Sequence, residues 1–173
     1  FLGFLDSALI YNLISKRRSP LNIVFSAPAG GMPVFAGWVA VTGGKISLIA
    51  VLMFLLVFIW APMHIWSLAF FFREDYRNAN VPMLPVVWSS RKVFVMLAVM
   101  NLIMILLSVF TGFYLRLSFI YLAIVIALGA VIIVLSIILL VKNSRKFAWI
   151  LFKYSSPYLA AVFLILVVEF LWI

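Results

Sequence analysis

The stretch that decides the fold class is residues 117–141, which read LSFIYLAIVIALGAVIIVLSIILLV and contain no charged side chain. A helix needs about 20 apolar residues to cross a hydrocarbon core about 30 Å thick. The apolar residues here are continuous and do not alternate with a period of two, which excludes the strand pattern of a transmembrane barrel. This run therefore predicts a membrane-spanning helix.

The whole chain has the same character. Of its 173 residues, 68% are hydrophobic and only 10% are charged, and the mean hydropathy is +1.32. A soluble domain is about half apolar and about a quarter charged, so lipid must be the solvent for most of this surface. We predict an all-α, polytopic transmembrane bundle of about six helices, in a single domain covering residues 1–173.

Charged and turn-forming residues divide the chain into apolar segments at about 1–14, 21–41, 46–72, 93–113, 117–141 and 157–173. The first would be only about 21 Å long as a helix, and we interpret it as the end of a helix that begins upstream. In the second, the pairs Ala27/Gly31 and Ala36/Ala40 predict close helix contact, so we expect a packed interior helix. The third should kink near Pro62.

Basic residues alternate between the two ends of these segments. The loops after the second and fourth segments hold one each, Lys45 and Arg116, and the other three loops hold 11 of the 13 Lys and Arg. The positive-inside rule therefore predicts that loops 15–20, 73–92 and 142–156 are cytoplasmic. Membrane orientation accounts for the net charge of +9, and no nucleic-acid partner is expected.

Few side chains could carry chemistry. The acids are Asp6, Glu74, Asp75 and Glu169, the one histidine is His64, and cysteine is absent, so a zinc site is not expected. Asp6 would lie about 15 Å deep in lipid, where an ionisable group is a functional candidate; a protonated carboxyl or a basic partner would explain it equally. His64 could face a cavity or hydrogen-bond a neighbouring helix.

Two of the basic loops could bind an anion. Residues 11–23 read YNLISKRRSPLNI, and their three adjacent cations could hold a diphosphate, although an ordinary positive-inside cluster would look the same. Residues 73–87 read REDYRNANVPMLPVV. Carboxylates hold Mg²⁺ and arginine binds phosphate oxygens bidentately, so this alternation suits a magnesium–diphosphate site. A solvated loop with local ion pairs would show the same pattern.

These loops resemble the signatures of the UbiA superfamily of intramembrane prenyltransferases, most closely its protoheme IX farnesyltransferase branch. Residues 11–23 are similar to the branch's Tyr-Thr-x-x-Leu-Lys-Arg-Arg-Thr-Pro-x-Asn-Ile, and residues 64–87, HIWSLAFFFREDYRNANVPMLPVV, to its second signature. Departures are Asn12 where Thr is usual and Asn80 where Gly is common. The family's first Asp-rich motif, Asn-x-x-x-Asp-x-x-x-Asp, has no counterpart among the four acids.

The resemblance implies nine helices around a lipid-accessible cavity, of which the segments here would be the fourth to the ninth. It implies transfer of a farnesyl group from farnesyl diphosphate to a vinyl group of protoheme IX, giving heme O in a prokaryotic cell membrane. Mg²⁺ would be held by Asp75 and the absent motif. By resemblance, the catalytic residues would be Asp75, Arg73 and His64, and the diphosphate ligands would be Lys16, Arg17, Arg73, Arg77, Tyr76 and Asn22.

Other functions remain open at this point. The chain could prenylate a quinone precursor or a lipid, or it could be a non-catalytic membrane subunit of a respiratory complex, as the absent Asp-rich motif suggests. Terminal oxidases and other heme-handling membrane proteins are the expected partners. If the chain is an enzyme, we expect Lys16, Arg73 and Asp75 to converge over one apolar pocket. Because half of a metal site is present, we expect residues 1–173 alone to make no heme O.

Overall fold

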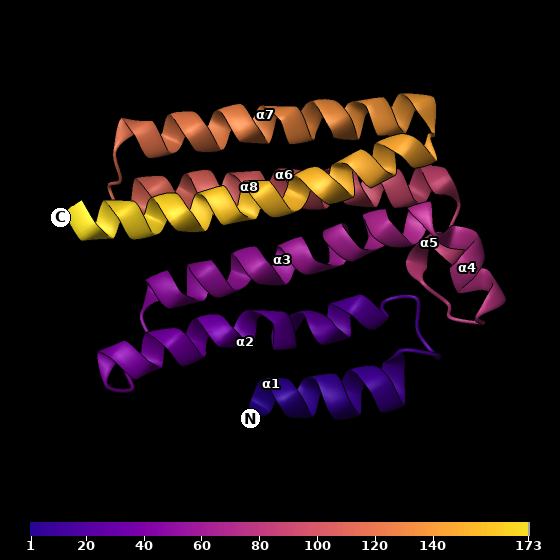
Figure 1. The fold of residues 1–173 in the computed structure, drawn as a ribbon, viewed down its shortest axis with the longest axis horizontal. Coiled ribbons are helices and arrows are strands. Elements are labelled where there is room, and N and C mark those ends of the chain that lie inside the picture. The colour runs from indigo at the N-terminus through magenta and orange to yellow at the C-terminus, as the bar shows by residue number, and fades with distance from the viewer. Residues whose placement is uncertain (173) are drawn as a thin grey trace.

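The computed structural model describes residues 1–172, in which every regular element is a helix (Figure 1). The elements are α1 (Leu2–Leu5), the π-helix η1 (Asp6–Ser15), α2 (Asn22–Thr42), α3 (Leu48–Phe71), α4 (Arg73–Asn78), α5 (Leu84–Val87), α6 (Ser90–Tyr114), α7 (Phe119–Lys142) and α8 (Arg145–Trp172). Helices α2, α3, α6, α7 and α8 are long and apolar enough to cross a membrane, and Leu2–Ser15 forms a shorter apolar helix. The predicted all-α polytopic bundle is confirmed, with five spanning helices where about six were predicted, because Leu2–Ser15 is shorter than a span. Ile173 lies outside the described residues.

The long helices lie side by side, with α3 at the centre between α2 on one side and α6 and α8 on the other (Figure 1). Helix α7 packs on α6 and α8, and η1 packs on the outer side of α2. The η1–α2 and α7–α8 connections and the short helices α4 and α5 lie at one end, which we call the basic end. The α2–α3 and α6–α7 connections lie at the other (Figure 1). The predicted alternation of the loops is thus confirmed.

Helix α2 continues through Pro28 and Pro33. Proline removes a backbone hydrogen bond and crowds the preceding turn, and here the N–H of Ala29 is donated to Asp6 Oδ2 of η1 at 3.2 Å. Asp6 therefore has a backbone amide as its partner, and no basic side chain is needed to explain it. The carboxylate ties the N-terminal helix to α2.

One of the two small-residue pairs in α2 makes the close contact that we predicted. Ala27 and Gly31 are buried, and a Cβ on Gly31 would lie only 2.5 Å from a ring carbon of Phe54 in α3. Ala36 and Ala40 are exposed, so that pair makes no close helix contact within residues 1–172. In this part of the chain α2 is covered by α3, η1 and the short helix α1, and its remaining surface is open.

Helix α8 begins at Arg145, twelve residues before the predicted start at Pro157. Its first turns are amphipathic: Ala148, Leu151 and Ser155 are buried, while the cations that suggested a loop face outward. Pro157 is exposed, so its missing N–H falls on the outer face. The predicted loop 142–156 is therefore mostly helical. The predicted loop 73–92 likewise contains α4, α5 and the start of α6.

At the end of the bundle opposite the basic end, Glu169 connects two helices. Glu169 of α8 accepts hydrogen bonds from the backbone N–H of Ser118 at 3.1 Å and from the Ser118 hydroxyl. Ser118 is the N-cap of α7 and accepts the N–H of Tyr121. A carboxylate at a helix N-terminus is favoured by the helix dipole, so Glu169 locks α8 to the start of α7.

Candidate functional site

The candidate site lies at the basic end, where α4 and α5 fold back beneath the end of α3. Asn80 adopts a left-handed conformation with φ of 55°, which asparagine tolerates better than most residues. The N–H of Val81 then donates to the Tyr76 carbonyl at 3.0 Å, and the prolines at 82 and 85 prevent a longer helix. This turn places residues 76–87 against the η1–α2 connection.

A small cavity of about 330 Å³ opens between these two segments, and we call it the rim pocket. It is lined by Arg17 from the η1–α2 connection and by Arg77, Asn80, Val81, Pro82, Val86 and Val87. The two guanidinium groups come from segments sixty residues apart in the sequence. Arginine's planar donors match the oxygens of a phosphate, so the rim pocket suits a diphosphate.

Arg77 also has an internal partner. Its Nη1 lies 2.6 Å from Glu74 Oε2, and the side chains of Arg77 and Glu74 are 51% and 55% exposed. Exposed ion pairs of this kind contribute about 0–1 kcal/mol. A doubly charged ligand can therefore displace Glu74 at little cost.

A larger cavity of about 700 Å³ lies deeper in the bundle, between η1, α2 and α3, and we call it the inner groove. Its polar lining includes Tyr11, His64 and Tyr76, which brings residues from both signature stretches to one place. The groove exists because α2 and α3 present small side chains along this face, namely Ser26, Ala29, Gly30 and Ala61. Residues 76–83 contribute to both cavities.

His64 is held firmly at the wall of the inner groove. Its imidazole stacks between Trp60 and Phe152, with ring centroids 4.4 and 4.2 Å apart. Nδ1 lies 2.8 Å from Ser155 Oγ of α8, and the indole N–H of Trp60 donates to the Ser155 carbonyl at 3.2 Å. The histidine therefore combines the two alternatives of the sequence analysis, because it hydrogen-bonds a neighbouring helix and also lines a cavity.

The predicted convergence of Lys16, Arg73 and Asp75 is not found, because none of the three lines the rim pocket or the inner groove. The Arg73 guanidinium donates to the Trp88 carbonyl at 3.2 Å and to the Ser90 hydroxyl at 3.4 Å, so it joins α4 to the start of α6. Lys16 lies over the ring of Tyr11 at 5.6 Å.

The position of Asp75 follows from helix geometry. Successive residues of α4 are about 100° apart around the axis, so Tyr76 points about 100° and Arg77 about 160° away from Asp75. Tyr76 is half-buried and faces the groove, while Asp75 is exposed. The motif alone could not show this, because α4 was expected to be a loop.

Asn22 stabilises the backbone of the η1–α2 connection and does not face either cavity. It is fully buried, and its Nδ2 donates to the Lys16 carbonyl at 3.1 Å. It lines neither cavity. We interpret Asn22 as the residue that closes the η1–α2 connection and so positions Arg17.

The residues present do not fit a complete Mg²⁺ site. The protein usually supplies such an ion with one or two carboxylates, and substrate phosphates and water complete its octahedron. Asp75 is the only rim carboxylate without an ion-pair partner among residues 1–172, because Glu74 is held by Arg77. No cluster of three His, Asp or Glu side chains occurs in the described chain.

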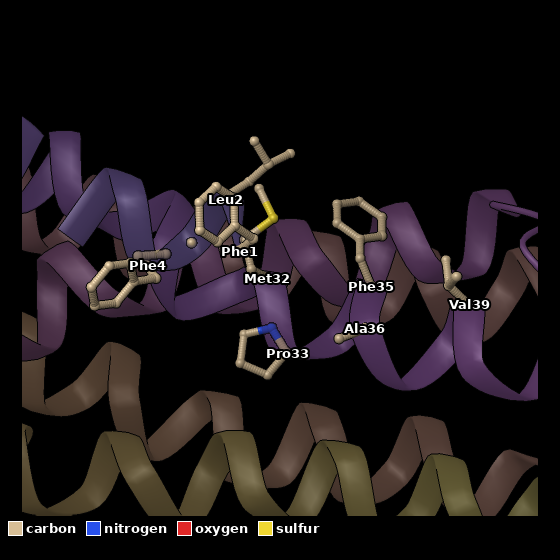
Figure 2. A pocket seen from close by; sticks show the side chains of 10 residues that line it. Phe1, Leu2, Phe4, Met32, Pro33, Phe35, Ala36 and Val39 are labelled. Atoms are coloured by element: carbon tan, nitrogen blue, oxygen red, sulfur yellow. The ribbon is translucent and has the colours of Figure 1, made fainter. Parts of the chain in front are cut away.

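A third cavity, of about 610 Å³, adjoins the inner groove and lies between the first helical turn and α2, at the outer edge of the bundle (Figure 1). Figure 2 shows its apolar side chains, which come from the first helical turn and from α2 and include Phe4, Met32, Phe35 and Val39. Gly3 and Ala29 line both this cavity and the inner groove, so the two adjoin. The cavity can take a hydrocarbon chain but offers nothing to a charged group.

The sequence analysis missed the residues that hold His64, namely Trp60, Phe152 and Ser155. Trp60 is one turn before His64, and that spacing was available as a signal. Phe152 and Ser155 lie about ninety residues away, in a stretch that was interpreted as a loop. No pattern in the sequence linked them to His64.

Taken in order from the basic end, the cavities change from a pair of arginines, to tyrosines and a histidine, to hydrocarbon. This arrangement defines a helical membrane protein that can hold an amphipathic anion with its charged group at the rim. The chain belongs to the UbiA prenyltransferase family, whose model matches residues 1–168.

Named relatives agree with this assignment. The chain is 45% identical to a protoheme IX farnesyltransferase of Desulforudis audaxviator over 96% of its own length and 52% of that protein. It is 40% identical to a protoheme IX farnesyltransferase 1 of Picrophilus torridus, over 97% of the chain and 56% of that protein. The chain thus spans about half the length of these curated relatives. No solved structure matches.

Proposed function

We propose that this chain forms the larger part of the substrate site of a protoheme IX farnesyltransferase, which transfers a farnesyl group from farnesyl diphosphate to protoheme and gives heme O. The observation that carries the proposal is the order of the three cavities in a chain of the UbiA family. The rim pocket suits the diphosphate, the inner groove the reacting carbon and the acceptor, and the apolar cavity the farnesyl tail. The relatives' printed names supply the acceptor.

In this proposal, Arg17 and Arg77 stabilise the leaving group. Breaking the carbon–oxygen bond moves negative charge onto the diphosphate and leaves an allylic cation. Donors already aimed at that charge lower the barrier without reorganising. The Asn22 side chain holds the backbone carbonyl of Lys16, the residue before Arg17, and Arg77 can exchange Glu74 for phosphate oxygens.

The inner groove would receive the cation and the acceptor vinyl group. The aromatic side chains of Tyr11, Trp60 and Tyr76 line it, and ring faces attract a cation. The vinyl carbon forms a bond to the farnesyl C1, and water quenches the new cation beside the porphyrin ring and releases a proton. Tyr76 lines the inner groove and is next in sequence to Arg77 of the rim pocket, so it would hydrogen-bond the diphosphate from the side of the groove.

The proposal also includes the metal ion, the roles of Lys16 and Arg73, the membrane orientation and the partner that receives heme O. Any Mg²⁺ that accompanies the diphosphate would need carboxylates other than those of the rim pocket lining, because Asp75, the free rim carboxylate of residues 1–172, lines neither cavity. Lys16 and Arg73 raise the positive potential at the rim without touching the ligand. The basic end faces the cytoplasm of a prokaryotic cell, and heme O is passed to a terminal oxidase or another heme-handling membrane protein.

The test is a product assay in membranes that contain this chain, supplied with farnesyl diphosphate, protoheme and Mg²⁺, with heme O measured by liquid chromatography and mass spectrometry. The chain is tested alone and together with a segment that carries the family's first Asp-rich motif. We expect heme O only in the supplemented membranes. Prenylation of a hydroxybenzoate in place of protoheme would contradict the proposal in favour of a quinone-type enzyme.

A second candidate function is a non-catalytic membrane subunit. It is favoured by one observation, namely that Lys16, Arg73 and Asp75 do not share a cavity. It predicts stoichiometric co-purification with an oxidase and no binding of a farnesyl diphosphate analogue. Measured binding of that analogue to the purified chain would exclude it.

A further inference from the structure

We infer that His64 is the axial ligand of the iron of the protoheme that occupies the inner groove, and that Ser155 is the residue that positions it. This inference rests on the proposed function, since it takes protoheme as the acceptor. It adds which atom of the chain binds the iron and how the remote helix α8 takes part in the site.

The surroundings of His64 leave one edge of the ring for a ligand. Trp60 and Phe152 cover its two faces, with interplanar angles of 23° and 29°, and Nδ1 is occupied by Ser155. Nε2 has no hydrogen-bond partner in the described part of the chain, yet it is not sealed from the surface. The residue lines the inner groove, so Nε2 is the nitrogen that an iron atom can reach.

The hydrogen bonds around Ser155 favour the tautomer that binds metals. Its hydroxyl is 2.8 Å from the Phe152 carbonyl and donates its single proton there. The same oxygen then accepts the Nδ1–H of His64, which leaves a lone pair on Nε2. Metal-binding histidines are commonly fixed in this way, with the second ring N–H donated to an oxygen. Ser155 is fully buried, so water does not compete for the bond.

The position also suits the reaction. His64 lies seven residues before the end of α3, about 10 Å inside the basic end. Protoheme ligated there would occupy the same groove that the proposed function assigns to the reacting carbon of the farnesyl group. His64 is the only histidine in the chain and cysteine is absent, so it is the only strong nitrogen or thiolate ligand available.

The experiment is a spectroscopic titration of the full chain in nanodiscs with hemin, after purification through a tag that contains no histidine. We expect the absorption and electron paramagnetic resonance signals of histidine-ligated ferric heme. His64→Ala should abolish them, and exogenous imidazole should restore them in His64→Gly. Ser155→Ala should weaken hemin affinity by about tenfold or more, the usual effect of removing the partner of a metal-binding histidine.

Two controls separate ligation from folding. Ser156→Ala removes the neighbouring hydroxyl, which makes no side-chain hydrogen bond within residues 1–172, and should leave hemin affinity unchanged. Metal-free protoporphyrin has no iron to ligate, so His64→Ala should bind it as the unchanged chain does. Retention of the histidine signature in His64→Ala, or equal losses for hemin and metal-free protoporphyrin, would overturn the inference. Neither result depends on turnover, so farnesyl transfer can succeed while this inference fails.

Discussion

Replacing Arg77 by glutamine tests the rim pocket most directly, because it removes one of the two guanidinium groups that line it. A hydrogen bond to a charged group contributes about 1.5–3 kcal/mol. Because the Arg77 side chain is 51% exposed, solvent screens the interaction and the lower limit applies. A loss of about 1.5 kcal/mol corresponds to slightly more than a tenfold rise in Kd.

The assay is equilibrium binding of a non-hydrolysable farnesyl diphosphate analogue to the chain in nanodiscs at fixed ionic strength. Arg18→Gln is the matched control, since Arg18 adjoins Arg17 but lines neither cavity. Glu74→Gln removes the competing carboxylate and should leave Kd equal or slightly lower. Equal losses from Arg18→Gln and Arg77→Gln would refute the reasoning, because the binding would then follow the general potential of the basic end.

Two further predictions concern stability. Gly31→Ala should be less stable than Gly37→Ala by about 1–3 kcal/mol because of overpacking. A Cβ on Gly31 would lie 2.5 Å from a ring carbon of Phe54, whereas a Cβ on Gly37 would have no neighbouring atom within 4 Å. Thermal unfolding in detergent measures the difference, and equal midpoints would contradict this prediction. Glu169→Gln keeps an acceptor at the start of α7 but loses the charge that the helix dipole favours, so its Tm should fall by about 2–4 °C, the shift for about 1 kcal/mol. A Tm equal to that of the unchanged chain would show that the charge contributes nothing.

The membrane topology could be predicted from the sequence because it depends on the hydrophobicity of each segment and on the number of basic residues in each loop. Four apolar runs, at 21–41, 46–72, 93–113 and 117–141, reach the length that a bilayer requires, and the structure has a long helix at each of them. The fifth long helix, α8, is longer than the run 157–173 that was predicted. The alternation of basic loops needs only a count of lysines and arginines. The signature stretches at 11–23 and 64–87 pointed to the UbiA family, which the family model confirms.

The candidate site was predicted less well, because a motif specifies neighbours in sequence and not the direction of a side chain. Arg77 and Asp75 are two residues apart in α4, yet Arg77 lines the rim pocket while Asp75 faces solvent. Arg73 donates to the Trp88 carbonyl, a partner that no spacing rule indicated. Of the predicted diphosphate ligands, the rim pocket therefore brings together Arg17 and Arg77 but not Lys16 or Arg73.

The sequence by itself determined that lipid is the solvent and which loops share a side, since hydrophobicity and charge add up residue by residue. Only the tertiary structure decided that Ser155 meets His64 across ninety-one residues, and that the exposed Pro157 lies within α8. Both depend on which face of a helix its neighbours cover. Packing between segments that are distant in the sequence determines which face is covered.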